Sequence, residues 1–255
     1  MTTGARVTEI WRHPVKSLRG ERLEAAEVTP DGLAGDRGWG IRDLGTGRIL
    51  TGRREPRLLM ASARLGDGGR PVLTLPDGAV LDGPGPATDA AVAAWLGRDV
   101  ALVPAADDPG GRAEFFADAT DDASDVLEWT MPAGRFVDAL PLLLLTADSL
   151  RAGRAVHDGE WDVRRFRPNL LLEGGGDGWT EDGWLGRELA VGGARLRAEQ
   201  PCTRCTMITR PQPGLDADVD VFRAVARNHG AALGVLARVV APGTVSVGDV
   251  LRAGG

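Results

Sequence analysis

Pro201-Cys202-Thr203-Arg204-Cys205 holds both cysteines of this 255-residue chain, and the interpretation of the other segments depends on it. A thiolate is a soft ligand that suits copper, zinc and iron–sulfur centres. Arg204 beside Cys205 would favour the ionised sulfur. The same C-x-x-C spacing is also typical of redox dithiols, of half a zinc site and of two buried apolar residues. Other parts of the sequence must distinguish these possibilities.

The residues around the two cysteines disfavour zinc and thioredoxin-like chemistry. A structural zinc site usually takes four cysteine or histidine ligands. The three histidines, His13, His157 and His229, show no zinc-like spacing from the cysteines. A redox dithiol of the thioredoxin type usually lies at the start of a helix. Residues 206–209 are predicted to form a strand, which argues against that type.

The composition indicates an ordinary globular protein, with 43% hydrophobic and 26% charged residues. A net charge of −6 argues against a broad nucleic-acid surface. The longest apolar run, residues 140–145, is too short to span a bilayer. The N-terminus lacks the apolar region of a signal peptide, and two cysteines do not make a disulfide scaffold. We therefore expect a cytoplasmic protein that binds neither nucleic acid nor membrane.

Lys16 is the only lysine among 30 lysine and arginine residues. In a chain that uses arginine almost everywhere, a single lysine indicates a position where arginine does not serve, although chance survival is the alternative. Lysine is a compact point charge with rotatable donors, whereas arginine is a rigid planar fork. Lys16 lies in the loop-like segment His13-Pro14-Val15-Lys16-Ser17, where charge and hydroxyl come together.

Short strands and tight turns are predicted for the first hundred residues. Residues 5–12 alternate apolar and polar side chains, the period of a half-buried strand. Turn sequences such as Pro76-Asp77-Gly78 separate further strands, predicted at residues 24–28, 38–42, 48–51, 72–75 and 79–81. This spacing indicates a β-barrel or sandwich. A short helix is expected at residues 88–96, with Thr88 as its N-cap and Gly97 just past its end.

The second half of the chain is also predicted to be β-rich. Residues 104–126 are acidic and poor in large aliphatic side chains, so we expect a mobile loop or a solvated linker there. Thr146 marks the start of a helix that is expected to reach about residue 157. A second helix is expected to start near residue 219 and to end at Gly230. Strands are predicted at residues 142–145, 170–172, 189–191, 194–197, 233–240 and 245–251.

Several segments together resemble the MOSC superfamily, named after the C-terminal domain of molybdenum cofactor sulfurase. The resemblance is to the branch with an N-terminal MOSC-type β-barrel half, which includes amidoxime-reducing and N-hydroxylated-base-detoxifying proteins. The matching segments run in family order: His13-Pro14-Val15-Lys16-Ser17, Gly35-Asp36-Arg37, Asp138-x-x-Pro141, Phe166-Arg167-Pro168-Asn169, Cys202-Thr203-Arg204-Cys205 and Pro242-Gly243-x-Val245-x-Val247-Gly248-Asp249.

The resemblance implies an α+β, β-rich fold: a MOSC-type β-barrel core, an N-terminal β-barrel half and a few peripheral helices. The expected domains are the N-terminal half at residues 1–103, the acidic loop or linker at residues 104–126 and the MOSC domain at residues 127–255.

The resemblance also implies a molybdenum cofactor, in which a pyranopterin dithiolene carries the metal and a terminal phosphate. Cys205 matches the family's metal-binding cysteine, and Asp138 matches an acidic residue near the metal. The remaining matched residues would hold the phosphate and the pterin: Lys16, Ser17, Arg37, Arg167, Asn169, Thr203 and Arg204. Ala139 and Leu140 stand where other members place hydroxyl residues, so contacts there would come from backbone groups.

These residue types suit that cofactor, but each also has a plainer interpretation. Arginine gives a dianionic phosphate two charge-assisted donors, and Asn169 can meet a pterin edge with a donor and an acceptor. Alternatively, Arg37 and Arg167 are surface ion-pair residues, and Asp138 and Asn169 are turn residues. Cys202 is interpreted as a buried thiol rather than a ligand.

The activity implied by the resemblance is that of a molybdenum-dependent oxidoreductase acting on N-hydroxylated compounds. Two electrons at molybdenum would remove the oxygen of an N–O bond as water, with Cys205 as metal ligand and Asp138 as proton relay. A ferredoxin-like cluster needs four cysteines, and this chain has two. We therefore expect a separate flavoprotein or ferredoxin as electron donor.

Two other functions remain open at this point. One is a non-catalytic carrier that binds the molybdenum cofactor, or holds a persulfide on Cys205, and hands it on. The other is a degenerate member of the family that binds no cofactor. Both would share the motifs of the reductase.

Overall fold

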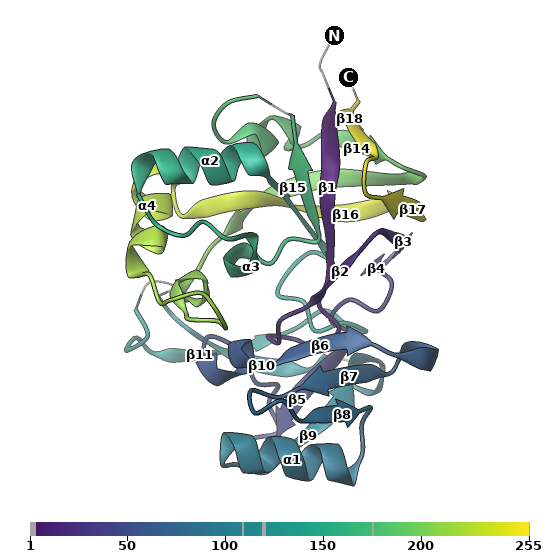
Figure 1. Cartoon of the computed structure of the whole chain (residues 1–255), viewed down its shortest axis with the longest axis vertical. Coiled ribbons are helices and arrows are strands. Elements are labelled where there is room, and N and C mark those ends of the chain that lie inside the picture. The colour runs from purple at the N-terminus through teal and green to yellow at the C-terminus, as the bar shows by residue number, and fades with distance from the viewer. Residues whose placement is uncertain (1–3, 109, 119–120, 175, 255) are drawn as a thin grey trace.

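The computed structural model describes residues 4–108, 110–118, 121–174 and 176–254. Figure 1 shows a large barrel with helices on one side, and below it a group of smaller sheets with a helix at the far end. The described chain ends lie close together, because Ala5 pairs with Leu251. The expected α+β, β-rich fold is confirmed.

Seven strands close into the barrel, in the order β13-β12-β16-β15-β14-β18-β1, and β1 pairs back with β13. All of these pairings are antiparallel except β12 with β13. The short strand β2 (Glu21–Leu23) extends the sheet beyond β1. The barrel strands are β1 (Ala5–Arg12), β12 (Leu142–Thr146), β13 (Leu170–Glu173), β14 (Glu188–Val191), β15 (Ala194–Thr203), β16 (Ala232–Ala241) and β18 (Val250–Ala253).

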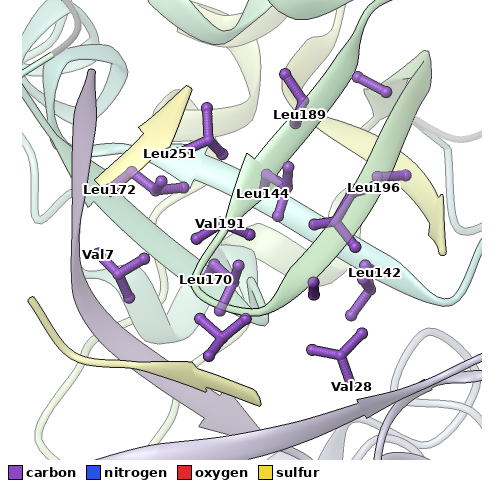
Figure 2. Packing of buried hydrophobic residues seen from close by; sticks show 14 of the residues in the cluster. Val7, Val28, Leu142, Leu144, Leu170, Leu172, Leu189, Val191, Leu196 and Leu251 are labelled. Atoms are coloured by element: carbon purple, nitrogen blue, oxygen red, sulfur yellow. The ribbon is translucent and has the colours of Figure 1, made fainter. Parts of the chain in front are cut away.

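The barrel interior is filled with aliphatic side chains, because alternate residues of each strand point inward. Figure 2 shows Val7, Leu144 and Leu196 converging from three of its strands. Val28, from the small sheet β17-β3-β4, covers one end of this core. The strands of that sheet are β3 (Ala25–Thr29), β4 (Gly32–Leu33) and β17 (Gly243–Ser246). A filled interior leaves functional side chains to the rim of the barrel.

Helices α2 (Ala147–Val156), α3 (Val163–Phe166) and α4 (Val219–His229) share a second core outside the barrel. Trp161 and Phe166, both fully buried, stack within it at a centroid distance of 5.7 Å. As predicted, the Thr146 hydroxyl caps α2 by accepting from the Ser149 backbone N–H, and Gly230 ends α4 in the left-handed conformation. No helix of the described chain has the length and apolar content needed to cross a membrane.

The smaller sheets surround a third core that includes Val15, Ile41 and Leu58. Helix α1 (Pro86–Leu96) packs against it through Val92 and Leu96. The strands around it are β5 (Trp39–Asp43), β6 (Ser62–Leu65), β7 (Pro71–Thr74), β8 (Val80–Asp82) and β9 (Val100–Pro104). The hairpin β10 (Arg112–Phe116) with β11 (Val126–Thr130) contributes Ala113 to a separate, smaller cluster. The 3-10 segments are η1 (Pro56–Met60), η2 (Asp67–Gly69), η3 (Ala105–Asp107), η4 (Thr180–Trp184) and η5 (Thr206–Thr209).

Three local predictions are wrong. Residues 206–209 form the 3-10 turn η5 and not a strand, because Ile208 is drawn into the helical core, where tertiary packing overrides β-propensity. The predicted strand at 245–251 is divided into β17 and β18, since Gly248 turns the chain at φ 95°. Helix α1 begins at Pro86 after Gly85, and the hydroxyl of Thr88 instead donates to the Gly83 carbonyl.

Two further expectations differ from the structure. The stretch at residues 104–126 was expected to be a loop or linker, but it contains η3 and strand β10, in which Ala113 and Phe116 are buried. The acidic residues that suggested a linker lie mostly outside the strand. At residues 48–51 only Ile49 forms bridges, with Arg42 and Ala113. Strand β1 belongs to the barrel built mainly from the second half of the chain; the sequence boundaries at residues 103 and 127 stay predictions.

Candidate functional site

A cavity of about 290 Å³, here called the basic cavity, opens at the rim of the barrel. All nine residues predicted for the site line it: Lys16, Ser17, Arg37, Asp138, Arg167, Asn169, Thr203, Arg204 and Cys205. They come from the loop after β1, the turn between β4 and β5, the segment before β12, the turn after α3 and the end of β15. Residues separated by almost 190 positions in the sequence are therefore brought to one site.

The backbone is strained where these side chains are held. Four non-glycine residues of the described chain have positive φ, namely Ser17 (68°), Arg37 (48°), Arg167 (55°) and Ala231 (61°). Each such conformation costs about 1–3 kcal/mol and persists only where the surrounding structure fixes it. Three of the four are predicted site residues, and the carbonyl of the fourth accepts from the backbone N–H of Arg204. The strained backbone therefore occurs where site side chains are positioned, at some cost in stability.

Arg37 is held by the buried carboxylate of Asp36, which also accepts from the His13 backbone N–H at 2.7 Å. The Asn169 side chain accepts from the Leu143 backbone N–H at 3.0 Å and from Arg37 at 3.4 Å, and it donates to the Trp11 carbonyl at 3.3 Å. Asn169 thus ties β1 to β12 and steadies Arg37. The pterin contact predicted for Asn169 stays a prediction.

Lys16 is buried, and its ammonium donates to the Phe136 carbonyl at 3.0 Å and to Asp138 at 2.6 Å. Two of its three donors are therefore used by the protein, which leaves one for a ligand. The neighbouring Ser17 hydroxyl accepts from the Gly52 backbone N–H at 2.8 Å. The compact ammonium of Lys16 reaches both the Phe136 carbonyl oxygen and the Asp138 carboxylate oxygen. The larger, planar guanidinium of an arginine would fit less well between these two oxygens.

Asp138 lines the cavity, and its side chain is 85% exposed. The surrounding protein disfavours its charge, but Lys16, Arg37 and Arg53 outweigh this effect and lower the pKa of the Asp138 carboxyl. It is therefore a carboxylate at neutral pH. An ionised group can accept a hydrogen bond or a proton, and it must take up a proton before it can deliver one.

Arg167 is a buried cation, 8% exposed, whose side chain makes no hydrogen bond or ion pair with the residues that the structure describes. Burial lowers its pKa to about 9, and repulsion from Arg37 adds to this effect, while the charges of Asp36 and Asp138 oppose it in part. Asp138 is the one acidic residue among those that line the basic cavity. Five basic side chains line it: Lys16, Arg37, Arg165, Arg167 and Arg204. An anionic ligand would compensate this excess of positive charge.

The two cysteines are free thiols in different surroundings. Cys205 lines the cavity, and burial raises the pKa of its thiol although Arg53, the Met207 backbone N–H and Arg204 oppose that rise. A metal that binds Cys205 would have to displace its proton. Cys202 is buried and accepts a hydrogen bond from Arg204. This arrangement agrees with the interpretation of Cys202 as a buried thiol.

In the described part of the chain, no group of three or more histidine, cysteine, aspartate or glutamate residues could hold a metal ion. A metal at Cys205 would therefore need other ligands, such as those of an organic carrier. The chemistry of the donor set fits such a group, because a soft sulfur lies beside cations that suit an anionic end.

A second cavity, of about 380 Å³, lies against the β10–β11 hairpin and is here called the hairpin cavity. Sequence reasoning missed it. Its distinctive lining residues are Thr51, Arg53, Ala113, Glu114, Phe115 and Trp129. Arg53 gave no signal in a sequence with so many arginines. Strand β10, which supplies Ala113, Glu114 and Phe115, lies in the stretch 104–126 that was expected to be a loop or linker.

Two domain families match this chain, each over nearly half of it. The model described as "MOSC N-terminal beta barrel domain" matches residues 4–119, and the model described as "MOSC domain" matches residues 133–252. Together they account for nearly all of the described residues.

Curated proteins with similar sequences include two amidoxime-reducing components. Mitochondrial amidoxime reducing component 2 of Bos taurus is 26% identical over 229 residues, covering 80% of this chain and 66% of that protein. Mitochondrial amidoxime-reducing component 1 of Homo sapiens is 27% identical over 232 residues, covering 80% and 65%. The chain thus spans just under two thirds of these relatives. Molybdenum cofactor sulfurase of Anopheles gambiae is 33% identical over 100 residues, covering 35% of this chain and 13% of that protein.

Solved structures with a similar chain path were also found. The YuaD protein of Bacillus subtilis aligns with a TM-score of 0.48 at 12% identity, covering 97% of this chain and 93% of its own. YiiM of Geobacillus stearothermophilus aligns with a TM-score of 0.36 at 20% identity, covering 45% and 54%.

Proposed function

Since the chain belongs to the MOSC family, with a MOSC N-terminal β-barrel domain followed by a MOSC domain, we propose that it is a molybdenum-cofactor-dependent reductase of N-hydroxylated compounds. The reaction consumes two electrons and two protons, breaks the N–O bond and releases water with the reduced nitrogen compound. The names of the amidoxime-reducing relatives support this substrate class.

The burial of the Arg167 guanidinium, without a hydrogen bond or ion pair to the described residues, is the observation that carries the proposal. A buried cation without a partner is costly, and the cost is recovered when an anion binds beside it. Lys16, Arg37 and Arg204 line the same cavity, so a dianionic phosphate would be met from several sides by charge-assisted hydrogen bonds. The buried Nε of Arg204 also lacks a partner among the described residues.

Cys205 would hold the metal through its sulfur, at the other end of a cofactor gripped by the basic side chains. When bound, the molybdenum cofactor supplies the two-electron chemistry. The residues of this chain bind it, orient it and manage protons. Asp138, ionised beside Lys16, accepts the hydrogen bond of an N–OH group and receives a proton that it can return to the leaving oxygen.

The electrons would come from another protein, a flavoprotein or a ferredoxin. The two cysteines of this chain cannot hold a four-cysteine iron–sulfur cluster. The relatives are each named a component, which fits a reductase that works with a separate donor.

Purification from a host that makes molybdenum cofactor tests the proposal. We expect about one molybdenum per chain, and reduction of benzamidoxime to benzamidine with reduced methyl viologen as donor. Cys205→Ala should remove turnover, whereas Cys202→Ser, which keeps a polar atom for Arg204, should retain it. Bound molybdenum without turnover on any N-hydroxylated compound would favour a carrier of cofactor or sulfur. Absence of molybdenum would indicate a member that binds no cofactor.

A further inference from the structure

The two cavities meet at one group of side chains. Lys16, Asp138 and Cys205 line both of them, together with Ser17, Thr203, Arg204 and Met207. The residues that match the family's cofactor positions but lie in one cavity only, Arg37, Arg167 and Asn169, are all in the basic cavity. A cofactor gripped by them would present its metal end at Cys205, towards the hairpin cavity.

The hairpin cavity has an aromatic wall. Ala113 pairs directly with Trp129 in the β10–β11 register, so their side chains lie on one face of the hairpin, and Phe115 lies on the same face. Trp129 is 39% exposed although it is a large aromatic residue. The wall therefore offers a flat apolar surface to a planar ligand.

Arg53 has no carboxylate partner, in contrast to Lys16, and it is not fixed by two short hydrogen bonds, in contrast to Arg204. Glu114 is paired with Arg48 at 3.1 Å and with Arg54 at 3.2 Å, and Asp138 is paired with Lys16. The guanidinium of Arg53 lies 5.7 Å from the Phe115 ring centroid and donates to the Phe116 carbonyl at 3.4 Å. Its buried Nε has no partner, and no ion pair joins it to a residue that the structure describes.

Arg54, the next residue, provides a natural comparison. Its guanidinium lies 4.9 Å from the ring of Phe116, whose side chain is on the opposite face of β10. Arg54 does not line the hairpin cavity. The two adjacent arginines thus contact side chains on opposite faces of β10, and of the two only Arg53 lines the hairpin cavity.

The hairpin is also fixed to the cysteine segment. Asp122, in the connection between β10 and β11, accepts from the Thr206 hydroxyl at 2.9 Å and pairs with Arg210. Thr206 follows Cys205 directly. The aromatic wall and the thiol are therefore held at a defined separation, as a substrate chamber requires.

From this arrangement we propose that the hairpin cavity is the substrate chamber, and that it favours planar aromatic N-hydroxylated compounds with an anionic ring substituent. Trp129 would stack on the ring, and Arg53 would pair with the anion. The volume of about 380 Å³ suits a ligand of one or two rings. This assignment rests on the proposed function, because it takes the reacting N–O group to lie at Cys205.

Binding measurements without an electron donor test the chamber separately from turnover. The probes are benzamidoxime, 4-carboxybenzamidoxime and 4-(trimethylammonio)benzamidoxime, titrated calorimetrically into the purified protein. We expect the carboxylate to bind about tenfold more tightly than the trimethylammonium compound, because one ion pair replaces one repulsion. Arg53→Met should remove the difference and Arg53→Lys should keep part of it. Arg54→Met changes net charge equally and should preserve it.

Equal affinities for the two charged probes in the wild type, or a preference that survives Arg53→Met, would overturn the assignment. Trp129→Leu should weaken the binding of all three probes by about the same factor, because aromatic stacking on the ring is lost without any change in charge. Thermal unfolding of each variant shows whether the fold is kept. Failure of the proposed function would appear elsewhere, as a lack of turnover with reduced viologen while the binding preference persists.

Discussion

Arg204 donates a hydrogen bond from Nη1 to Sγ of Cys202 at 2.9 Å. Its Nη2 donates to the Phe166 carbonyl at 2.8 Å, so the guanidinium is fixed on two sides. The two cysteines of the C-x-x-C sequence therefore have separate tasks. Cys205 presents its sulfur to the cavity, and Cys202 positions the arginine between them.

Replacing Cys202 should impair cofactor retention without removing the metal-binding thiol. Cys202→Ala deletes one anchor of Arg204, a loss worth about 1 kcal/mol, and should reduce bound pterin several-fold. Cys202→Ser should behave almost like the wild type. Pterin and molybdenum content per chain, measured after dialysis, check this. Equal retention in the alanine variant would mean that the Phe166 contact alone positions Arg204.

Arg167→Met should stabilise the cofactor-free protein and weaken the cofactor-bound one. Burial and repulsion from Arg37 disfavour the charge of Arg167 more than Asp36 and Asp138 favour it, so its removal should raise the free energy of unfolding by about 1–3 kcal/mol in the absence of cofactor. Retention of cofactor should fall at the same time, since a phosphate donor is lost. Urea unfolding of the cofactor-free protein measures the change in stability, and pterin analysis of the loaded protein measures the change in cofactor retention. A less stable cofactor-free variant would contradict the reasoning.

Lys16→Arg should lower cofactor content by about tenfold, although charge is conserved, because a planar fork replaces a point charge at a buried site. The ammonium now satisfies both Phe136 and Asp138. Arg22→Lys, at a residue 60% exposed and paired with Glu9, is the matched control and should change nothing. Molybdenum content per folded chain is the readout. Full loading in Lys16→Arg would support chance survival of the lone lysine.

His13 should make the protein less stable in mild acid. Burial, followed by the charges of Arg167 and Arg37, lowers the pKa of His13 well below its ordinary value of 6.5. Below that pH the unfolded chain takes up a proton that the folded chain does not. The free energy of unfolding should therefore fall by about 1.4 kcal/mol per pH unit from this group, down to the folded-state pKa. Above pH 6.5 the group should contribute nothing.

The matched variant for this test is His13→Phe, which keeps a ring against Trp11, where the two rings now stack with centroids 6.4 Å apart. Urea unfolding of the cofactor-free proteins between pH 5 and 7.5, done in parallel, isolates the histidine because the carboxylates titrate in both. The slope difference should vanish above the ordinary pKa. Identical slopes in both proteins would show that His13 protonates in the folded state.

Most of the barrel strands and the helix ends at Thr146 and Gly230 could be predicted because local signals suffice for them. The alternation in residues 5–12 and the Thr146 cap depend on neighbours in the sequence. The predicted members of the basic cavity were found from motif segments of distinctive composition, most of which lie between strands or helices. Their meeting at one cavity is a result of the structure.

The hairpin cavity could not be predicted, because its chemistry arises from pairing. Trp129 and Ala113 come together through a strand register, and Arg53 differs from Arg54 only in the face of β10 that it approaches. Residues 206–209 were mispredicted for a related reason, because the core beside α4 determines their conformation. No local pattern contains that information.

Strand β1 has both of its barrel neighbours far along the chain, since β13 begins at Leu170 and β18 at Val250. During synthesis β1 can pair at once with the short strand β2 through residues 10–12, but its two barrel neighbours are made only much later. Closure of the barrel is therefore a late event, and contacts between such distant segments slow folding.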